Sequence, residues 1–215
     1  MTDFSAARRH MVDGQVRTAD VTDLRVISAM QEVERERFVP PSATALAYLD
    51  LDLPVGEGRR LIKPMVLAKL IHAADLAATD KVLDVGCACG YAAAVLARIA
   101  GHVVALEQDA ALAQAAKAAL SPLPNVEAVS GPLTAGWAKA GPYDVILLEG
   151  ATEVEPQAFL PQLKDGGRLV CVFGVAPNAK AMLYRRSGAE LGGRAIFDAT
   201  AALLPGFAKP PVFAF

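Results

Sequence analysis

The chain has 215 residues, of which 53% are hydrophobic and 20% are charged, with a net charge of −2. This length and apolar content predict one folded domain and exclude a disordered chain. A slightly acidic balance argues against a nucleic-acid partner, which needs a cationic surface. There is no apolar run of the roughly 18 residues that a membrane span needs and no signal-peptide core, so we expect a cytoplasmic protein without membrane contact.

The first 50 residues are predicted to be helical and largely separate from any sheet. Apolar residues within 24–33 recur at helical spacing, and Thr22 or Asp23 suits the N-cap of that helix. Residues 49–58 are rich in proline and glycine and predict a loop. Pro64 is then expected to open a further helix, since proline is tolerated in the first turn.

From residue 80 onward, strand and helix patterns alternate, which predicts a mostly parallel sheet with helices on both faces. The part from residue 181 is expected to close the sheet with an antiparallel hairpin, followed by a packed tail that extends to the terminus. Within one domain, we expect a helical region at 1–75, a cofactor-binding core at 76–175 and a sheet-completing region at 176–215. The predicted strands are 81–85, 102–107, 125–129, 143–149 and 167–173, and the predicted helices are 90–100, 109–120 and 155–163.

The segment 81–91 carries the strongest functional signal, because a buried strand containing Asp84 runs directly into a turn of small residues. Gly86 and Gly90 frame that turn, and good helix formers follow it. Small residues let the backbone approach a ligand closely, and a helix start offers unpaired N–H groups. The segment therefore predicts the strand–turn–helix unit of a nucleotide-cofactor site.

A second strand pattern ends in Glu107, where an acid can bind the hydroxyl groups of a ribose. The spacing alone also allows a dinucleotide, but the turn does not have the G-x-G-x-x-G form. An acid at the strand end followed by small residues at alternate positions is typical of S-adenosylmethionine-dependent methyltransferases. A strand–helix–strand unit without a cofactor is the remaining alternative.

The three cysteines, an odd count, fit a reduced compartment better than a disulfide framework. Cys87 and Cys89 flank Ala88 at the expected helix start, where a thiol pKa tends to fall. The C-x-C spacing, with Cys171 far away, is a poor match to a zinc site. We therefore expect no metal and interpret these cysteines as small residues that pack in the turn.

Several segments in the same order resemble the protein-L-isoaspartate O-methyltransferase family. The resemblance covers roughly residues 11–175 and weakens beyond residue 180. Its motifs are the residues 11–15, E-R-F-V-P at 36–40, A-Y-L-D at 47–50, L-P-V-G at 53–56, V-L-D-V-G-C-A-C-G-Y at 82–91, Y-D-V-I at 143–146, L-P-Q-L at 160–163 and G-G-R-L-V at 166–170.

The resemblance implies a seven-stranded, three-layer Rossmann-like methyltransferase fold. It implies S-adenosylmethionine as the cofactor and a damaged aspartyl carboxylate of a protein or peptide as the methyl acceptor. Glu107 would hold the ribose hydroxyls and Gln108 would border the adenine. The other cofactor-binding residues that the resemblance predicts are Asp84, Gly86, Cys87, Ala88, Gly90, Pro132, Leu133 and Glu149.

The sequence departs from the family pattern at positions near the chemistry. Ile62 stands where the family has a serine beside the acceptor, and Pro132 stands where it has an acid near adenine. Ala88 replaces the middle glycine of the turn, and Glu149 follows the fourth core strand in place of a threonine. Lys63 is either a contact for the acceptor carboxylate or a solvated lysine, and the catalytic residues are otherwise not assigned.

These departures leave two alternatives beside isoaspartyl methylation. One is a methyltransferase of the same fold with a different acceptor, either a small molecule or another protein. The other is a non-catalytic homologue that binds the cofactor. The sequence does not predict an oligomeric state.

Overall fold

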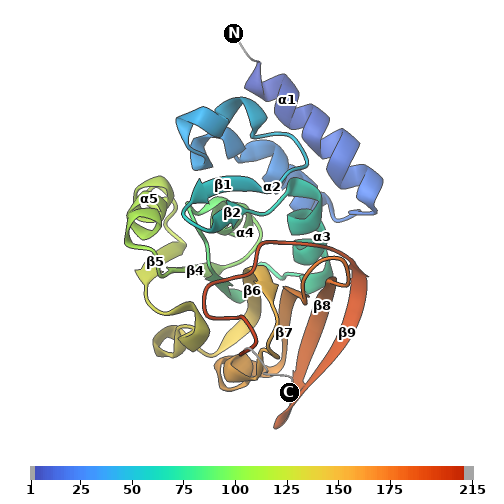
Figure 1. The fold of residues 1–215 in the computed structure, drawn as a ribbon, viewed down its shortest axis with the longest axis vertical. Coiled ribbons are helices and arrows are strands. Elements are labelled where there is room, and N and C mark those ends of the chain that lie inside the picture. The colour runs from blue at the N-terminus through green and yellow to red at the C-terminus, as the bar shows by residue number, and fades with distance from the viewer. Residues whose placement is uncertain (1–2, 211–215) are drawn as a thin grey trace, which may run out of the picture.

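The fold is that of a computed structural model, which describes residues 3–210. A seven-stranded sheet forms its centre, with the strand order β5-β4-β3-β6-β7-β8-β9 (Figure 1). The strands β3 to β7 pair in parallel, and β8 and β9 add as an antiparallel hairpin. The sheet strands are β3 (Lys81–Val85), β4 (His102–Glu107), β5 (Val126–Ser130), β6 (Tyr143–Thr152), β7 (Leu163–Phe173), β8 (Lys180–Ser187) and β9 (Glu190–Asp198).

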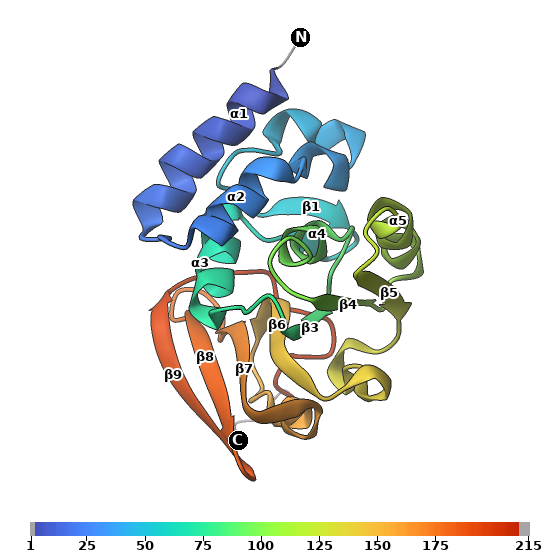
Figure 2. The same ribbon diagram turned by 180° about the vertical axis from the view of Figure 1, so that it is seen from behind.

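Three aspartates begin helices in this chain, because the carboxylates of Asp3, Asp23 and Asp109 each accept a hydrogen bond from a backbone N–H of the first turn. Proline opens another helix at Pro64, as predicted. The helices are α1 (Phe4–Met11), α2 (Leu24–Glu32), α3 (Pro64–Ala74), α4 (Tyr91–Leu96) and α5 (Ala110–Leu120). Figure 2 shows α1 and α2 at the end of the molecule beyond the sheet.

The two faces of the sheet are covered differently. Alternate residues of each strand point to opposite faces, so Val82 and Leu83 belong to separate apolar clusters. The first face packs against α3, α4 and α5. The second face packs against 3₁₀ turns and the C-terminal segment, which contribute Leu133, Phe159 and Phe207. The predicted helices on both faces are therefore found as full α-helices on one face only.

The loop expected at 49–58 is wrong in part, because β1 (Leu53–Gly56) pairs antiparallel with β2 (Arg59–Leu61). Gly58 has a φ of 65°, which allows a tight connection between these two strands. The prolines and glycines that indicated a loop thus belong to a small hairpin. This hairpin lies between the N-terminal helices and the sheet (Figure 1).

Two predicted helices were also too long or of another type. The helix expected at 90–100 ends at Leu96, and its chain continues to Ala100 in hydrogen-bonded turns. The helix expected at 155–163 is a 3₁₀ helix at Gln157–Gln162, because Pro161 interrupts α-helical hydrogen bonding there. β6 and β7 are correspondingly longer than predicted.

The C-terminal hairpin is confirmed as β8 and β9. After β9 the chain crosses back to the end of β6, as the dark red segment in Figure 1 shows. Leu204 and Phe207 are buried there, at 1% and 2% exposure, so this part of the tail is packed as expected. The expected tail at 211–215 lies outside the described residues. Among the described residues, no helix is long and apolar enough to cross a membrane.

Candidate active site

The turn after β3 has a backbone that only small residues tolerate well. Gly86, Ala88 and Gly90 have φ values of 80°, 48° and 94°, which lie in the left-handed region. A Cβ at Gly90 would lie 2.8 Å from a side-chain carbon of Leu120. The turn therefore needs glycine at its last position, whereas Ala88 accepts a conformation that glycine adopts more easily.

Glu107 lies at the carboxyl end of β4, beside this turn, and its carboxylate accepts four hydrogen bonds. Its Oε2 accepts from the Ala88 backbone N–H at 2.8 Å and from Arg59 Nη2 at 2.8 Å. Its Oε1 accepts from the backbone N–H groups of Gln108 at 2.9 Å and Asp109 at 3.1 Å. The carboxylate thus fixes the turn after β3 to the turn after β4.

Arg59 is a site residue that the sequence analysis missed. Its side chain is 5% exposed and comes from β2, 48 residues before Glu107. Its Nη2 also donates to the carbonyl of Gly86 at 2.7 Å. The guanidinium therefore lies across the turn at the atoms where a ribose was expected. The only sequence signal was its place directly after the L-P-V-G-E-G run.

Asp84 and Glu149 form a pair of buried carboxyl groups at the ends of β3 and β6. The two carboxyl groups lie within hydrogen-bond reach of each other, and no other side chain among residues 3–210 is bonded to their oxygens. Burial raises the pKa of Asp84 to about 7, and the charge of Glu107 acts in the same direction. Burial, followed by the charge of Asp84, raises the pKa of Glu149 well above its usual range. Both carboxyls therefore hold protons far more readily than exposed acids do.

Leu204 fills the space between the turn and β6. A Cβ at Gly86 would lie 2.9 Å from Leu204 Cδ2 and 3.0 Å from Arg59 Nη2. A Cβ at Gly150 would lie 2.6 Å from Leu204 Cγ. One leucine side chain therefore touches both glycines that border this edge of the sheet.

The polar groups of this edge fit S-adenosylmethionine in kind. That compound carries a sulfonium, an ammonium group, a ribose diol and a carboxylate, and Asp84, Glu107 and Glu149 offer three carboxyl groups for the first three of these. Leu204 and Arg59 lie against Gly86 at this edge. The donor set therefore fits the cofactor in kind, and Leu204 and Arg59 pack against the glycines that border this edge.

The structure brings together only some of the residues that were predicted to bind the cofactor. Asp84, Gly86, Cys87, Ala88, Gly90, Glu107 and Glu149 all lie around the turn. Leu133 is buried and also close, 3.6 Å from the Cβ position of Gly86. Gln108 and Pro132 are exposed, and Gln108 Oε1 accepts from the Leu133 backbone N–H at 3.4 Å.

On the expected acceptor side, Ile62 is 2% exposed and its carbonyl accepts from Arg35 Nη2 at 2.7 Å. Arg35 is also fully buried, donates to the Ala47 carbonyl at 2.8 Å and lies over the ring of Tyr91. Sequence analysis missed this arginine too. Lys63 is partly exposed, and its backbone N–H donates to Asp52 at 2.8 Å.

The cysteines do not behave as reactive thiols. Burial raises the pKa of Cys89 to about 11 and raises that of Cys87 well above the usual value. The tendency of a helix start to lower a thiol pKa is therefore outweighed by burial and by the nearby carboxyl groups. Among the described residues, no group of three or more His, Cys, Asp or Glu side chains has the geometry of a metal site.

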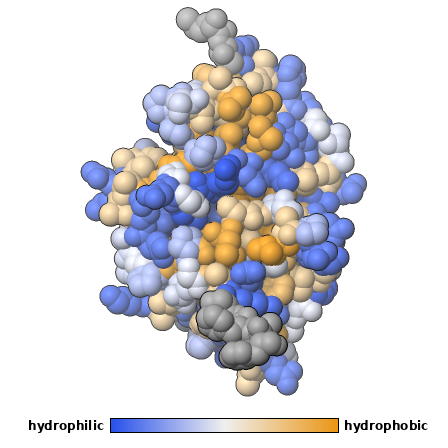
Figure 3. Space-filling model, viewed as in Figure 1, coloured by the Kyte–Doolittle hydropathy of each residue, from blue (hydrophilic) through white to orange (hydrophobic). Residues whose placement is uncertain are grey.

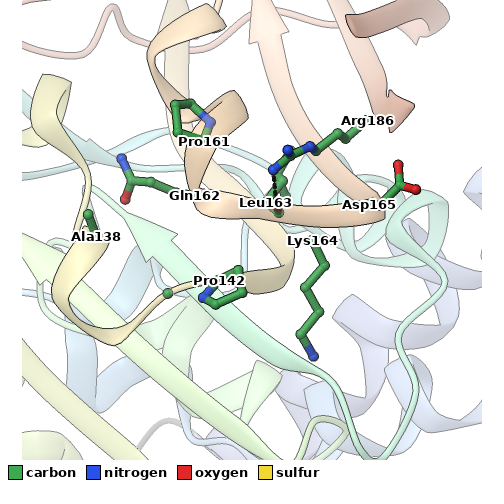
Figure 4. A pocket seen from close by; sticks show the side chains of 9 residues that line it. Ala138, Pro142, Pro161, Gln162, Leu163, Lys164, Asp165 and Arg186 are labelled. Carbon is green, nitrogen blue, oxygen red and sulfur yellow. Dashed lines mark hydrogen bonds between the residues drawn. The ribbon is translucent and has the colours of Figure 1, made fainter. Parts of the chain in front are cut away.

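A separate surface cavity of about 550 Å³ lies at the opposite ends of β6 and β7 (Figure 4). Arg186, Lys164 and Asp165 line it. The guanidinium of Arg186 is engaged by the carbonyls of Leu160 and Leu163. Lys164 pairs with Asp144 at 2.8 Å. The charged groups of the cavity are thus largely paired within the protein. The cavity is also remote from the turn after β3.

Comparisons with known proteins agree with this architecture. The chain is 41% identical to a protein-L-isoaspartate O-methyltransferase of Methylorubrum populi over 191 residues, which are 88% of this chain and 89% of that protein. It is 40% identical to protein-L-isoaspartate O-methyltransferase 1 of Rhodopseudomonas palustris over 184 residues, 85% of this chain and 75% of the relative.

Solved structures match over most of the fold. A protein-L-isoaspartate O-methyltransferase matches with a TM-score of 0.80 and 24% identity, over 93% of this chain and 66% of that one. A Plasmodium falciparum structure described as a β-aspartate methyltransferase in complex with S-adenosyl-L-homocysteine matches with a TM-score of 0.77 and 15% identity, over 92% and 97% of the two chains. The profile of the protein-L-isoaspartate(D-aspartate) O-methyltransferase family matches residues 6–196. The chain therefore belongs to the protein-L-isoaspartate(D-aspartate) O-methyltransferase family.

Proposed function

We propose that this protein is an S-adenosylmethionine-dependent O-methyltransferase that esterifies the carboxyl group of isoaspartyl residues in proteins, a step of protein repair. The observation that carries the proposal is the carboxyl-lined edge of the sheet, where Asp84, Glu107 and Glu149 surround a glycine turn. Family relatives that share about 40% of its residues over most of the chain carry the name of this activity.

The roles of the residues follow from their charges. When bound, S-adenosylmethionine supplies a methyl group activated by a positively charged sulfur. Glu107 is the group that would accept from the ribose hydroxyls, after Arg59 has moved off its Oε2. Asp84 and Glu149 are the groups that would face the cationic end of the cofactor, because a positive charge offsets the cost of ionising buried carboxyls.

The acceptor needs no general base, because a carboxylate is already ionised at neutral pH. The protein contributes by aligning the two reactants and by removing water from the nucleophile. Burial raises the pKa of Glu149 well above its usual range, so this carboxyl takes up a negative charge less readily than an exposed acid and repels an acceptor carboxylate less. Lys63, partly exposed at the start of α3, is the cation that we assign to attract it.

A second acceptor class is favoured by one observation. Ile62 is buried where a hydroxyl donor was expected, and its backbone is held by Arg35. A carboxylate thus meets no hydroxyl there, so a methyltransferase of the same fold with a different acceptor is the alternative. We further propose that residues 1–215 act as one domain and that the protein works in the cytoplasm.

The test is transfer of labelled methyl groups from S-adenosylmethionine to a synthetic peptide that contains one isoaspartyl residue. The control is the same peptide with an ordinary aspartyl residue. The proposal predicts base-labile methyl ester on the isoaspartyl peptide alone. Equal background labelling of both peptides, by protein that binds the cofactor, would favour the alternative acceptor class.

A further inference from the structure

The segment after β9 returns to the active-site edge and is bonded to β6. The Ala151 backbone N–H donates to the Ala202 carbonyl at 2.8 Å, and the Leu204 N–H donates to the Ala151 carbonyl at 2.9 Å. Leu203 thus makes a parallel bridge with Ala151. We call residues 199–207 the C-terminal strap. It pairs with β6 on the side of β3, beyond the point where the β3–β6 pairing ends, at the place where the carboxyl ends of the strands would face a ligand.

The strap is anchored by Phe207, on the C-terminal side of Leu204. Phe207 is 2% exposed and stacks on Phe159 with ring centroids 6.3 Å apart. Its carbonyl accepts from the Glu153 backbone N–H at 2.9 Å. Figure 3 shows apolar surface over the middle of the face that the strap crosses in Figure 1. The strap is therefore a packed element of the fold.

Leu204 occupies the place that the proposed function needs for the cofactor. Its side chain meets the Cβ positions of both Gly86 and Gly150 at less than 3 Å. Because Gly86 and Gly150 have no side chains, they leave a space at this edge of the sheet, and the Leu204 side chain fills that space. Leu204 also joins the apolar cluster of the second sheet face, together with Leu133.

Leu204 also places a hydrocarbon beside groups that suit a cation. The carboxyl groups of Asp84 and Glu149 are buried beside each other, and no cationic side chain in the described part of the chain is bonded to either. Buried carboxyl groups without a cationic partner are costly, and acids with raised pKa values in such a place mark a candidate ligand site. While the strap is in place, the two carboxyl groups therefore have no cation bonded to them, and a cationic ligand would supply one.

We propose that the C-terminal strap is an autoinhibitory element: Leu204 competes with S-adenosylmethionine for the turn after β3, and the cofactor binds only when the strap leaves β6. This inference rests on the proposed function, because it concerns the same site. The apparent affinity then equals the intrinsic affinity multiplied by the fraction of molecules with an open strap. If the strap is open in about one molecule in a hundred, the cofactor binds about 100-fold more weakly than to a chain in which the Leu204 side chain does not fill the site. We call that side chain the plug.

Two matched substitutions in the strap test this competition by calorimetric titration with S-adenosylhomocysteine. Leu204→Ala removes the plug, and Leu203→Ala removes the same three carbons from a neighbour that packs in the other cluster. We expect Leu204→Ala to bind at least about 10-fold more tightly than the wild type. Leu203→Ala should change affinity by less than about threefold. Circular dichroism melting establishes that each variant is folded, and Leu204→Val supplies a milder variant with an intermediate affinity.

Hydrogen exchange gives a readout that does not depend on activity. The amides of Ala151, Glu153 and Leu204 are bonded across the strap contact, so they should exchange slowly in the free protein. S-adenosylhomocysteine should speed their exchange by at least about 10-fold, while the amides of β3 keep their protection.

Equal affinities of wild type and Leu204→Ala would overturn the inference, and methyl transfer by both would leave the proposed function intact. Slower exchange of these three amides on ligand addition would also overturn it. If neither folded protein binds S-adenosylhomocysteine, the plug is not what closes the site, and the proposed function fails as well.

Discussion

The guanidinium of Arg59 and the carboxylate of Glu107 form an ion pair of 2.8 Å in which the two side chains are 5% and 1% exposed. The pair joins the β1–β2 hairpin to the end of β4, two elements far apart in sequence. The carboxylate keeps three backbone donors besides the arginine. In the proposed function, the arginine is therefore the part of this network that moves when a ribose binds Glu107.

Replacing Arg59 by alanine should destabilise the fold, because one charge of a buried pair is left without its partner. We expect the free energy of unfolding to fall by about 3 kcal/mol. Denaturant unfolding followed by circular dichroism measures it. Arg60→Ala is the matched control, since Arg60 neighbours it on β2 but is exposed, and should cost less than about 0.5 kcal/mol. Equal losses for both variants would show that the buried pair carries no special weight.

The buried pair of Asp84 and Glu149 predicts that stability falls as pH rises. The folded Asp84 keeps its proton up to about pH 7, whereas the usual pKa is 3.8, so the folded state binds more protons between these values. Stability is therefore greatest at the acidic end of this window and declines through it. Burial raises the pKa of Glu149 in the same direction.

Glu149→Gln should reduce this decline by at least about 1 kcal/mol between pH 5 and pH 8. Urea unfolding at the two pH values gives the comparison. The exposed Glu190→Gln serves as control and should reproduce the wild-type decline. A decline in Glu149→Gln as large as in the wild type would contradict the assignment of the buried carboxyl pair.

Gly150→Ala tests the close contact between β6 and the strap. Its Cβ would lie 2.6 Å from Leu204 Cγ and 2.8 Å from the Ala202 carbonyl oxygen, so the strap has to shift. We expect a loss of about 1–3 kcal/mol and faster proteolysis within residues 199–209. Gly192→Ala on β9, where a Cβ meets nothing within 4 Å, is the control and should change neither. An unchanged proteolysis pattern in Gly150→Ala would mean that the strap is not displaced.

Arg35→Met tests how the acceptor side is held. Arg35 is buried without a carboxylate partner among the described residues, and it supports the carbonyls of Ala47 and Ile62. Methionine keeps much of the volume but leaves two buried acceptors unpaired, so we expect a loss of about 2–4 kcal/mol in thermal or urea unfolding. Arg37→Met removes an arginine that is 71% exposed and should be nearly neutral. Similar stabilities for the two variants would refute this role.

The parallel core was predictable because its signals are local. Each strand from β3 to β6 is an apolar run next to a turn, and Asp84 and Glu107 end strands that are adjacent in the sheet. Their meeting at one edge follows from parallel pairing alone. The capping aspartates and Pro64 likewise act within a few residues, so helix starts were predicted better than helix ends.

The rest depends on contacts between distant segments. The ion pair of Arg59 and Glu107 spans 48 residues, and the L-P-V-G-E-G run before Arg59 does not indicate its partner. Leu204 lies in the region beyond residue 180, where the family resemblance fades. Its position at the turn depends on the return of the chain after β9, which no periodic pattern encodes. Consequently the carboxyl groups proposed to bind the cofactor were predicted, whereas Arg59 and Leu204 were not.

Equilibrium dialysis of the intact wild-type chain against labelled S-adenosylmethionine, at pH 8 where Asp84 is ionised, tests the central claim most directly. We predict saturable binding of one molecule per chain, weakened at least about 10-fold by Glu107→Gln, which removes the charged acceptor for the ribose. Absence of binding to both the wild type and Leu204→Ala, with both proteins folded, would contradict the assignment of this edge of the sheet as a cofactor site.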